Sequence, residues 1–207
     1  MVEGREGLRL VIKYCLAMVP YRIILASNSP RRKELLAGLD VDFEVRVIQG
    51  IDESYPEMLP TADIAEYISQ KKAAAYRQTM AADELVITAD TIVVSGHDVL
   101  GKPRDDDEAR RMLHRLSGCT HQVITGVTLT TQKEQKSFSV KTDVTFKVLS
   151  DEEIDYYIRK YHPSDKAGAY GIQEWIGYIG VVELHGSYFN VMGLPVQRIY
   201  EALRSIS

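Results

Sequence analysis

The segment YRIILASNSPRRKELL (residues 21–36) places a strand, a short polar loop and a helix directly after one another. Its apolar start predicts a buried strand that ends at the small polar residues. Ser29 followed by Pro30 is typical of a helix start, since serine can cap the helix and proline lacks only an N–H that would be unpaired there. Leu36 belongs to the apolar face of this helix, and Gly38 indicates its end. Strand and helix in close succession favour a fold that mixes the two.

Two arginines stand at the start of this helix, where the backbone N–H groups already make the surroundings electropositive. Arg31 and Arg32 are therefore well placed to hold an anion, and the small residues Ser27 and Ser29 would let the backbone approach it. The segment lacks the glycine pattern of a phosphate-binding P-loop. On spacing alone, a plain connection with two solvated arginines explains the pattern equally well.

A second buried strand, ELVITADTIVV (residues 84–94), carries a carboxylate in its middle. An ionised Asp90 cannot be buried there without a partner or a metal. We therefore interpret Asp90 as a general base or a metal ligand, with Thr91 beside it. The alternative is an aspartate that caps a turn or pairs with a lysine.

Further charged residues lie in predicted loops and on a predicted helix. Asp52 and Glu53 in the segment GIDE could coordinate Mg²⁺, which binds carboxylates and water beside phosphates. Lys72 on a helix and Lys102 in the segment LGKP are cations whose default interpretation is a solvated side chain. Several cations with two or three carboxylates, and no Ser–His or Cys–His pair, suit metal-assisted attack of water on a phosphoanhydride.

The order of the remaining patterns favours an α/β or α+β fold with a mixed twisted sheet and two lobes around a cleft. Regular alternation predicts a half-exposed strand over residues 41–48. Thr61 is expected to cap a helix that continues to Tyr76. Ser150 and Glu153 match a capping box at the start of another helix.

The overall composition narrows the class of protein. The chain has 207 residues, 25 Lys and Arg against 29 Asp and Glu, and a net charge of −4. This acidic balance argues against a nucleic-acid partner, because non-specific binding requires excess positive charge. Two cysteines make no disulfide framework, which favours a cytoplasmic location. The apolar N-terminus is too short to span a membrane and resembles no signal peptide, so no membrane association is expected. We interpret residues 1–17 as an extension, with Met18 as a possible start of the domain at 18–207.

Eight segments occur in the same order as in Maf proteins, the nucleoside triphosphate pyrophosphatases, and the chain resembles that family from about residue 21 to its last helix. These segments are LASNSPRRKELL, GIDE, KKAAA, ITADTIVV, GKP, RMLHRLSG, HQVITGV and DKAGAYGIQ. The resemblance implies a two-lobed fold related to the inosine triphosphate pyrophosphatases, with a central cleft. It also implies a divalent cation (Mg²⁺, Mn²⁺ or Co²⁺), a nucleotide substrate cleaved to monophosphate and pyrophosphate, and a possible homodimer.

The resemblance also assigns roles to individual positions. Asp90 matches the proton acceptor and a metal ligand, and Glu53 matches the acidic residue near the metal. The residues that match the surroundings of the triphosphate are Ser29, Arg31, Arg32, Lys72 and Lys102. Arg31, Thr91 and Gln173 match the positions that mark the branch acting on dTTP and UTP. Asn28 and Lys71 depart from the family's usual residues.

Two other functions are weighed against this one. A nucleotide-binding regulator of septum formation, a role associated with the family name, would need the cations but no base. A nonspecific phosphatase would release orthophosphate rather than pyrophosphate.

Overall fold

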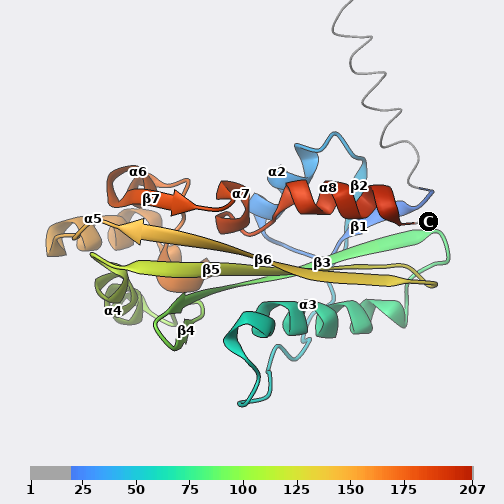
Figure 1. Cartoon of the computed structure of the whole chain (residues 1–207), viewed down its shortest axis with the longest axis horizontal. Coiled ribbons are helices and arrows are strands. Elements are labelled where there is room, and N and C mark those ends of the chain that lie inside the picture. The colour runs from blue at the N-terminus through green and yellow to red at the C-terminus, as the bar shows by residue number, and fades with distance from the viewer. Residues whose placement is uncertain (1–19, 207) are drawn as a thin grey trace, which may run out of the picture.

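A mixed sheet of seven strands runs through the middle of the computed structural model, which describes residues 20–206 (Figure 1). The strands are β1 (Arg22–Leu25), β2 (Phe43–Val45), β3 (Glu84–Ser95), β4 (Asp98–Leu100), β5 (Thr120–Thr130), β6 (Gln135–Phe146) and β7 (Val181–His185). Their order is β2-β1-β3-β5-β6-β7, with β4 paired to the far end of β3. Strand β1 is parallel to β2 and β3, and all other pairs are antiparallel. The expected mixed sheet is confirmed.

Helices cover both faces of this sheet. They are α2 (Pro30–Ala37), α3 (Thr61–Arg77), α4 (Asp106–Leu116), α5 (Asp151–Tyr161), α6 (Trp175–Gly180), α7 (Tyr188–Val191) and α8 (Val196–Ser205), with short 3₁₀ turns at Pro163–Asp165 and Ala167–Ala169. Helix α3 lies along one face, and α2 and α8 lie on the opposite face (Figure 1). Within residues 20–206, none of the helices has the length and apolar composition that crossing a membrane requires.

Strand β3 is paired on both sides at its two ends but not in its middle. Its first four residues pair with β1, and residues 93–95 pair with β4. Between them, in the part of the chain that the structure describes, residues 88–92 have β5 as their only strand neighbour. The sheet therefore has an opening at the position of Asp90 and Thr91.

Alternate residues of this open stretch face opposite sides of the sheet. Asp90 contacts Lys72 of α3, and Ile92 packs in a cluster with Ile68 of the same helix. Ala89 belongs to a second apolar cluster, built with α2 and α8, while Val93 belongs to a third, built with α4, α5 and α6. These last two clusters are the cores of the two expected lobes, and they meet at the opening.

A glycine on β5 brings α3 close to the sheet opposite Asp90. Gly126 is the register partner of Asp90. A Cβ atom at Gly126 would lie 2.2 Å from the backbone carbon of Ala65 and from the backbone nitrogen of Glu66. Any side chain would thus push α3 away from the sheet. This close contact brings Lys72 within reach of Asp90.

Two local expectations were wrong and two were confirmed. The strand expected over 41–48 is limited to Phe43–Val45, because the hydroxyl of Tyr76 donates to the carbonyl of Arg46 and accepts from the amide of Ile48, which turns the chain away. Helix α3 begins at Thr61, with Pro60 as its cap and no capping side chain. The caps at Ser29 and Ser150 are present as expected. The extension 1–17 and Met18 lie outside the described residues.

A buried carboxylate joins the first three strands. Glu84 at the start of β3 is 2% exposed and accepts two hydrogen bonds from Arg46 (2.7 and 2.9 Å) and one from Arg22 (3.1 Å). The hydrogen bonds from Arg46 are the largest cause that lowers the pKa of Glu84, to about 2. The charged carboxylate is therefore the form that the folded chain stabilises.

Replacing this carboxylate should make the stability of the chain less sensitive to acid. Because the pKa of Glu84 is lower in the folded chain than in the unfolded one, its contribution is complete above about pH 4.5 and is lost as the pH falls towards 2. Glu84→Gln should lower the free energy of unfolding by about 1.5–3 kcal/mol at pH 7, and by much less near pH 2. Urea unfolding at several pH values measures this difference, with the exposed Glu57→Gln as control. An equal loss at both pH values would contradict the assignment.

Candidate active site

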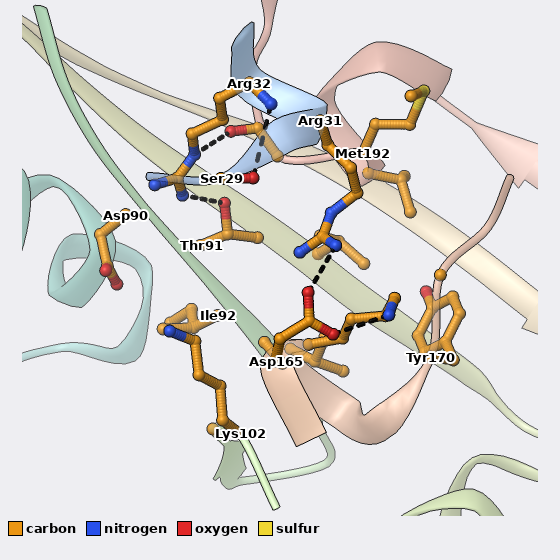
Figure 2. Close-up of a pocket in the computed structure, with 18 of the residues that line it drawn as sticks. Ser29, Arg31, Arg32, Asp90, Thr91, Ile92, Lys102, Asp165, Tyr170 and Met192 are labelled. Carbon is orange, nitrogen blue, oxygen red and sulfur yellow. Dashed lines mark hydrogen bonds and ion pairs between the residues drawn. The ribbon is translucent and has the colours of Figure 1, made fainter. Parts of the chain in front are cut away.

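A pocket of about 350 Å³ lies at the opening of the sheet, between the two lobes (Figure 2). Of the residues expected at the site from the sequence, Ser27 and Asp52 are not part of its lining, and Asp52 pairs with Lys71 instead. The lining includes the other nine: Ser29, Arg31, Arg32, Glu53, Lys72, Asp90, Thr91, Lys102 and Gln173. These residues come from β3, from helices α2 and α3 and from four loops. The structure therefore brings together residues that are up to 144 positions apart (29 to 173), while the roles assigned to them stay predictions.

Asp90 and Lys72 form a shielded ion pair at one side of the pocket. The Lys72 ammonium donates to Asp90 Oδ1 at 2.7 Å and lies 3.1 Å from Glu53 Oε1. The side chains of Lys72 and Asp90 are 13% and 14% exposed, whereas Glu53 is 56% exposed. The structure thus confirms that Asp90 is paired with a lysine. This ion pair uses Oδ1 and leaves Oδ2 of Asp90 without a partner among the described residues.

The carboxylates of Glu53 and Asp90 are suitable ligands for a hard divalent cation that is also bound by a phosphate. Among residues 20–206, no group of three or more His, Cys, Asp or Glu could hold a metal by itself. Glu53 and Asp90 nevertheless both reach a single cation, the Lys72 ammonium. Mg²⁺ is commonly held by one or two carboxylates while substrate phosphates and water complete its coordination.

The Arg32 guanidinium fills the opening beside β3. It donates to the carbonyls of Ala89 (2.9 Å) and Gly193 (2.8 Å) and to the hydroxyl of Thr91 (3.1 Å). Ala89 has no strand partner on this side, so the guanidinium takes the place of a neighbouring strand for its carbonyl. Burial lowers the pKa of Arg32, and the negative charge of Asp90 opposes this effect. Most Arg32 donors are thus bound to protein acceptors rather than turned to a ligand.

Arg31 is directed across the pocket towards the other lobe, where Figure 2 shows it facing Asp165. Its guanidinium donates to Asp165 Oδ2 at 2.8 Å, and Lys166 donates to Asp165 Oδ1 at 2.7 Å. Burial would raise the pKa of Asp165, but these two hydrogen bonds outweigh burial and lower it. A triphosphate that binds Arg31 must therefore compete with a fully ionised carboxylate.

Sequence reasoning assigned no role to Asp165, Lys166 or Tyr170, all of which line the pocket. They lie in the segment DKAGAYGIQ, which contributed only Gln173 to the expected site. Lys166 is 7% exposed. Two adjacent opposite charges at the start of a glycine-containing segment were the available signal, but such pairs are usually solvated.

The lining carries more positive than negative charge. Its cations are Arg31, Arg32, Lys72, Lys102 and Lys166, against the carboxylates of Glu53, Asp90 and Asp165. Three of these cations are ion-paired with the carboxylates. Lys102 has no ion-pair partner in the described part of the chain, and its exposed ammonium lies on the same side of the pocket as Asp90 (Figure 2). Lys102 can therefore bind an anion without giving up an ion pair.

Two polar groups differ in what they can offer a ligand. The Thr91 hydroxyl accepts from Arg32 and lies 2.9 Å from the hydroxyl of Thr125, which donates to the carbonyl of Asn190. Thr91 must then donate to Thr125, so its own hydrogen is used. Gln173 Oε1, by contrast, is buried and accepts no hydrogen bond from the described residues. The Gln173 amide is therefore the polar group that most needs a partner in the pocket.

The fold and this pocket define an α/β protein with a cation-lined cavity where two lobes meet at a break in a mixed sheet. A family model described as Maf-like protein matches residues 22–206, and the chain belongs to that family.

Named relatives are highly similar to this chain over most of their length. A protein of Phocaeicola vulgatus named dTTP/UTP pyrophosphatase is 64% identical over 186 residues, covering 90% of this chain and 96% of the relative. One of Parabacteroides distasonis with the same name is 60% identical, covering 89% and 95%. The solved structure of the Staphylococcus aureus Ham1 protein aligns with a TM-score of 0.49 at 17% identity, covering 89% of this chain and 98% of that one.

Replacing Arg32 by lysine should destabilise the chain although the charge is kept. A lysine ammonium cannot hold three acceptors in the planar arrangement of a guanidinium. We expect Arg32→Lys to lower the free energy of unfolding by about 1–3 kcal/mol, as measured by urea denaturation. Arg198→Lys, at an exposed position of α8, should cost less than about 0.5 kcal/mol. Equal stability of the two variants would show that Arg32 does not close the sheet opening.

Proposed function

We propose that this chain is a nucleoside triphosphate pyrophosphatase that hydrolyses dTTP and UTP to the monophosphate and pyrophosphate. One observation carries the proposal: a single pocket is lined by a shielded carboxylate, an excess of cations and Gln173, whose buried amide oxygen has no hydrogen-bond partner among residues 20–206. These are the groups needed to activate water, hold a triphosphate and recognise a base. The name shared by relatives that are 60–64% identical supports the same substrates.

The cations would bind the triphosphate and stabilise the departing pyrophosphate. Lys102 needs no rearrangement, because it has no ion-pair partner within residues 20–206. Arg31 would exchange Asp165 for a phosphate oxygen, and Lys72, which contacts both Glu53 and Asp90, would also contact a phosphate. Charge-assisted donors arranged before the reaction stabilise developing negative charge without reorganisation. Of the two arginines at the start of α2, Arg31 would thus bind the ligand, whereas most Arg32 donors stay bound to the protein.

Asp90 would accept a proton from the attacking water. Lys72 fixes Oδ1 at 2.7 Å, which leaves Oδ2 to receive the proton. Glu53 and Asp90 would hold a divalent cation, Mg²⁺, Mn²⁺ or Co²⁺, which when bound neutralises phosphate charge. Attack at the α-phosphorus then releases pyrophosphate in a single step.

Gln173 would distinguish uracil and thymine from cytosine. N3 carries a hydrogen in uracil and thymine, so it can donate to the unpartnered Oε1 of Gln173. In cytosine N3 is itself an acceptor, and two acceptors would face each other without a hydrogen. A buried polar group left in that state is costly, which makes such contacts selective.

A nucleotide-binding regulator of septum formation remains the second function considered, and no observation on this site favours it. Such a protein would need cations for its ligand, but it would not need a shielded carboxylate beside them. The cytoplasmic location and the homodimer expected from the sequence stay predictions.

Asp90→Asn should abolish most of the pyrophosphate release while triphosphate binding persists. Asparagine keeps the shape of the side chain but cannot accept the proton, and removal of a general base typically costs about 10²–10⁴-fold in rate. Pyrophosphate release from UTP with Mg²⁺, Mn²⁺ or Co²⁺ measures the rate, and calorimetry measures binding. Asp42→Asn, on the exposed surface, is the control. A wild-type kcat in Asp90→Asn, or orthophosphate as the first product of the wild-type chain, would refute the proposed reaction.

Gln173→Ala should reduce the preference for UTP over CTP. We expect the wild-type kcat/KM to favour UTP and dTTP over CTP by on the order of 10²-fold or more, because the wrong base leaves a buried polar group unpaired. The variant should lose most of this preference, whereas the exposed Gln78→Ala should keep it. Equal wild-type rates on UTP and CTP would contradict the proposed substrates, and an unchanged ratio in Gln173→Ala would remove Gln173 from base recognition.

A further inference from the structure

The segment that carries Gln173 is a tight turn closed by a single buried hydroxyl. The amide of Glu174 donates to the carbonyl of Gly171 at 3.0 Å, so residues 171–174 form a turn with Gln173 at its third position. The hydroxyl of Tyr157 on α5 accepts a hydrogen bond from the Gly171 amide at 3.0 Å and donates one to Glu174 Oε2. One side chain thus contacts both ends of the turn.

A buried lysine and two carboxylates hold this arrangement from the other side. The Lys166 ammonium lies 3.2 Å from Glu174 Oε1 and pairs with Asp165 at 2.7 Å. Tyr157 is fully buried, and burial together with the neighbouring Glu174 carboxylate raises its pKa. The phenol therefore remains a neutral donor across the ordinary pH range, and the carboxylate has partners on both of its oxygens.

The Gln173 amide lies close to the backbone of the turn at Gly171. A Cβ atom at Gly171 would lie 3.0 Å from Gln173 Nε2 and 3.0 Å from the carboxyl carbon of Glu174. The amide of Gln173 and the carboxylate of Glu174 are thus both packed against Gly171. A change in the position of either end of the turn would move the amide.

We propose that Tyr157 is a positioning residue for base recognition: its hydroxyl fixes the turn 171–174 so that Gln173 Oε1 meets the N3–H of the pyrimidine. This inference rests on the proposed function. Neither Tyr157 nor Glu174 lines the pocket, whereas Gln173 does. An effect of Tyr157 on selectivity must therefore pass through the turn and not through contact with the substrate.

Tyr157→Phe tests this role, because it removes the hydroxyl and keeps the ring. The UTP:CTP ratio of kcat/KM should fall about tenfold or more, which matches the loss of hydrogen bonds involving a charged group. The inhibition constant of inorganic pyrophosphate, which is expected to bind among the phosphate-binding cations, should stay at its wild-type value. A merely structural role of Tyr157 would weaken both measurements together.

The matched control is Tyr161→Phe. Tyr161 lies one turn further along α5 and stacks on Tyr157 with ring centroids 5.1 Å apart. Its hydroxyl makes no hydrogen bond to the described residues, so its loss should leave the UTP:CTP ratio unchanged. If Tyr157→Phe does not fold, Glu174→Gln removes the charge at the other end of the same contact and should lower the ratio in the same way.

The double variant Tyr157→Phe/Gln173→Ala separates the possible outcomes. Its UTP:CTP ratio should equal that of Gln173→Ala alone, because Tyr157 acts only through Gln173. A further fall would overturn the inference. If Gln173→Ala lowers the ratio but neither Tyr157→Phe nor Glu174→Gln does, the inference is wrong while the proposed function stands. If Gln173→Ala itself leaves the ratio unchanged, the proposed base recognition fails and this inference fails with it.

Discussion

The carbonyl of Ala89 lacks a strand partner, and the Arg32 guanidinium supplies the missing hydrogen bond. This contact allows β3 to run on past the end of β1 and to reach β4 with an opening in between. An unpaired backbone group in such a place is costly, and the hydrogen bond from Arg32 offsets this cost for the Ala89 carbonyl. The same guanidinium donates to the carbonyl of Gly193 and to the hydroxyl of Thr91. Arg32 therefore has a structural role, connecting three segments that line the pocket or border it.

The opening explains how one pocket can use both faces of a sheet. Asp90 faces α3, where Gly126 lets the helix approach closely enough for Lys72 to pair with it. Thr91 faces the opposite side, where the two lobes meet. A ligand in the pocket can thus contact side chains from both faces at once. The ion pairs inside the pocket engage Arg31, Lys72 and Lys166, whereas Lys102 has no ion-pair partner among the described residues and is available to an anion.

The sequence predicts those parts of the structure that depend on local signals. The caps at Ser29 and Ser150 and the buried strand around Asp90 were predicted because their determinants lie within a few residues. The partners of Arg32 could not be predicted, since its acceptors at Ala89 and Gly193 depend on which strands pair. The early end of β2 likewise depends on Tyr76, some 30 residues away. Motif resemblance, and not periodicity, brought Gln173 into the expected site.

The central claim is that a nucleotide lies across the opening of β3, with its phosphates beside Asp90 and its pyrimidine beside Gln173. A crystal structure with the nonhydrolysable analogue α,β-imido-UTP and Mg²⁺ tests it most directly. The account predicts the α-phosphorus next to Asp90, the β- and γ-phosphates among Lys72, Lys102 and Arg31, and N3 of the uracil within hydrogen-bond distance of Gln173 Oε1. An analogue bound in the reverse orientation, or outside this pocket, would contradict the account.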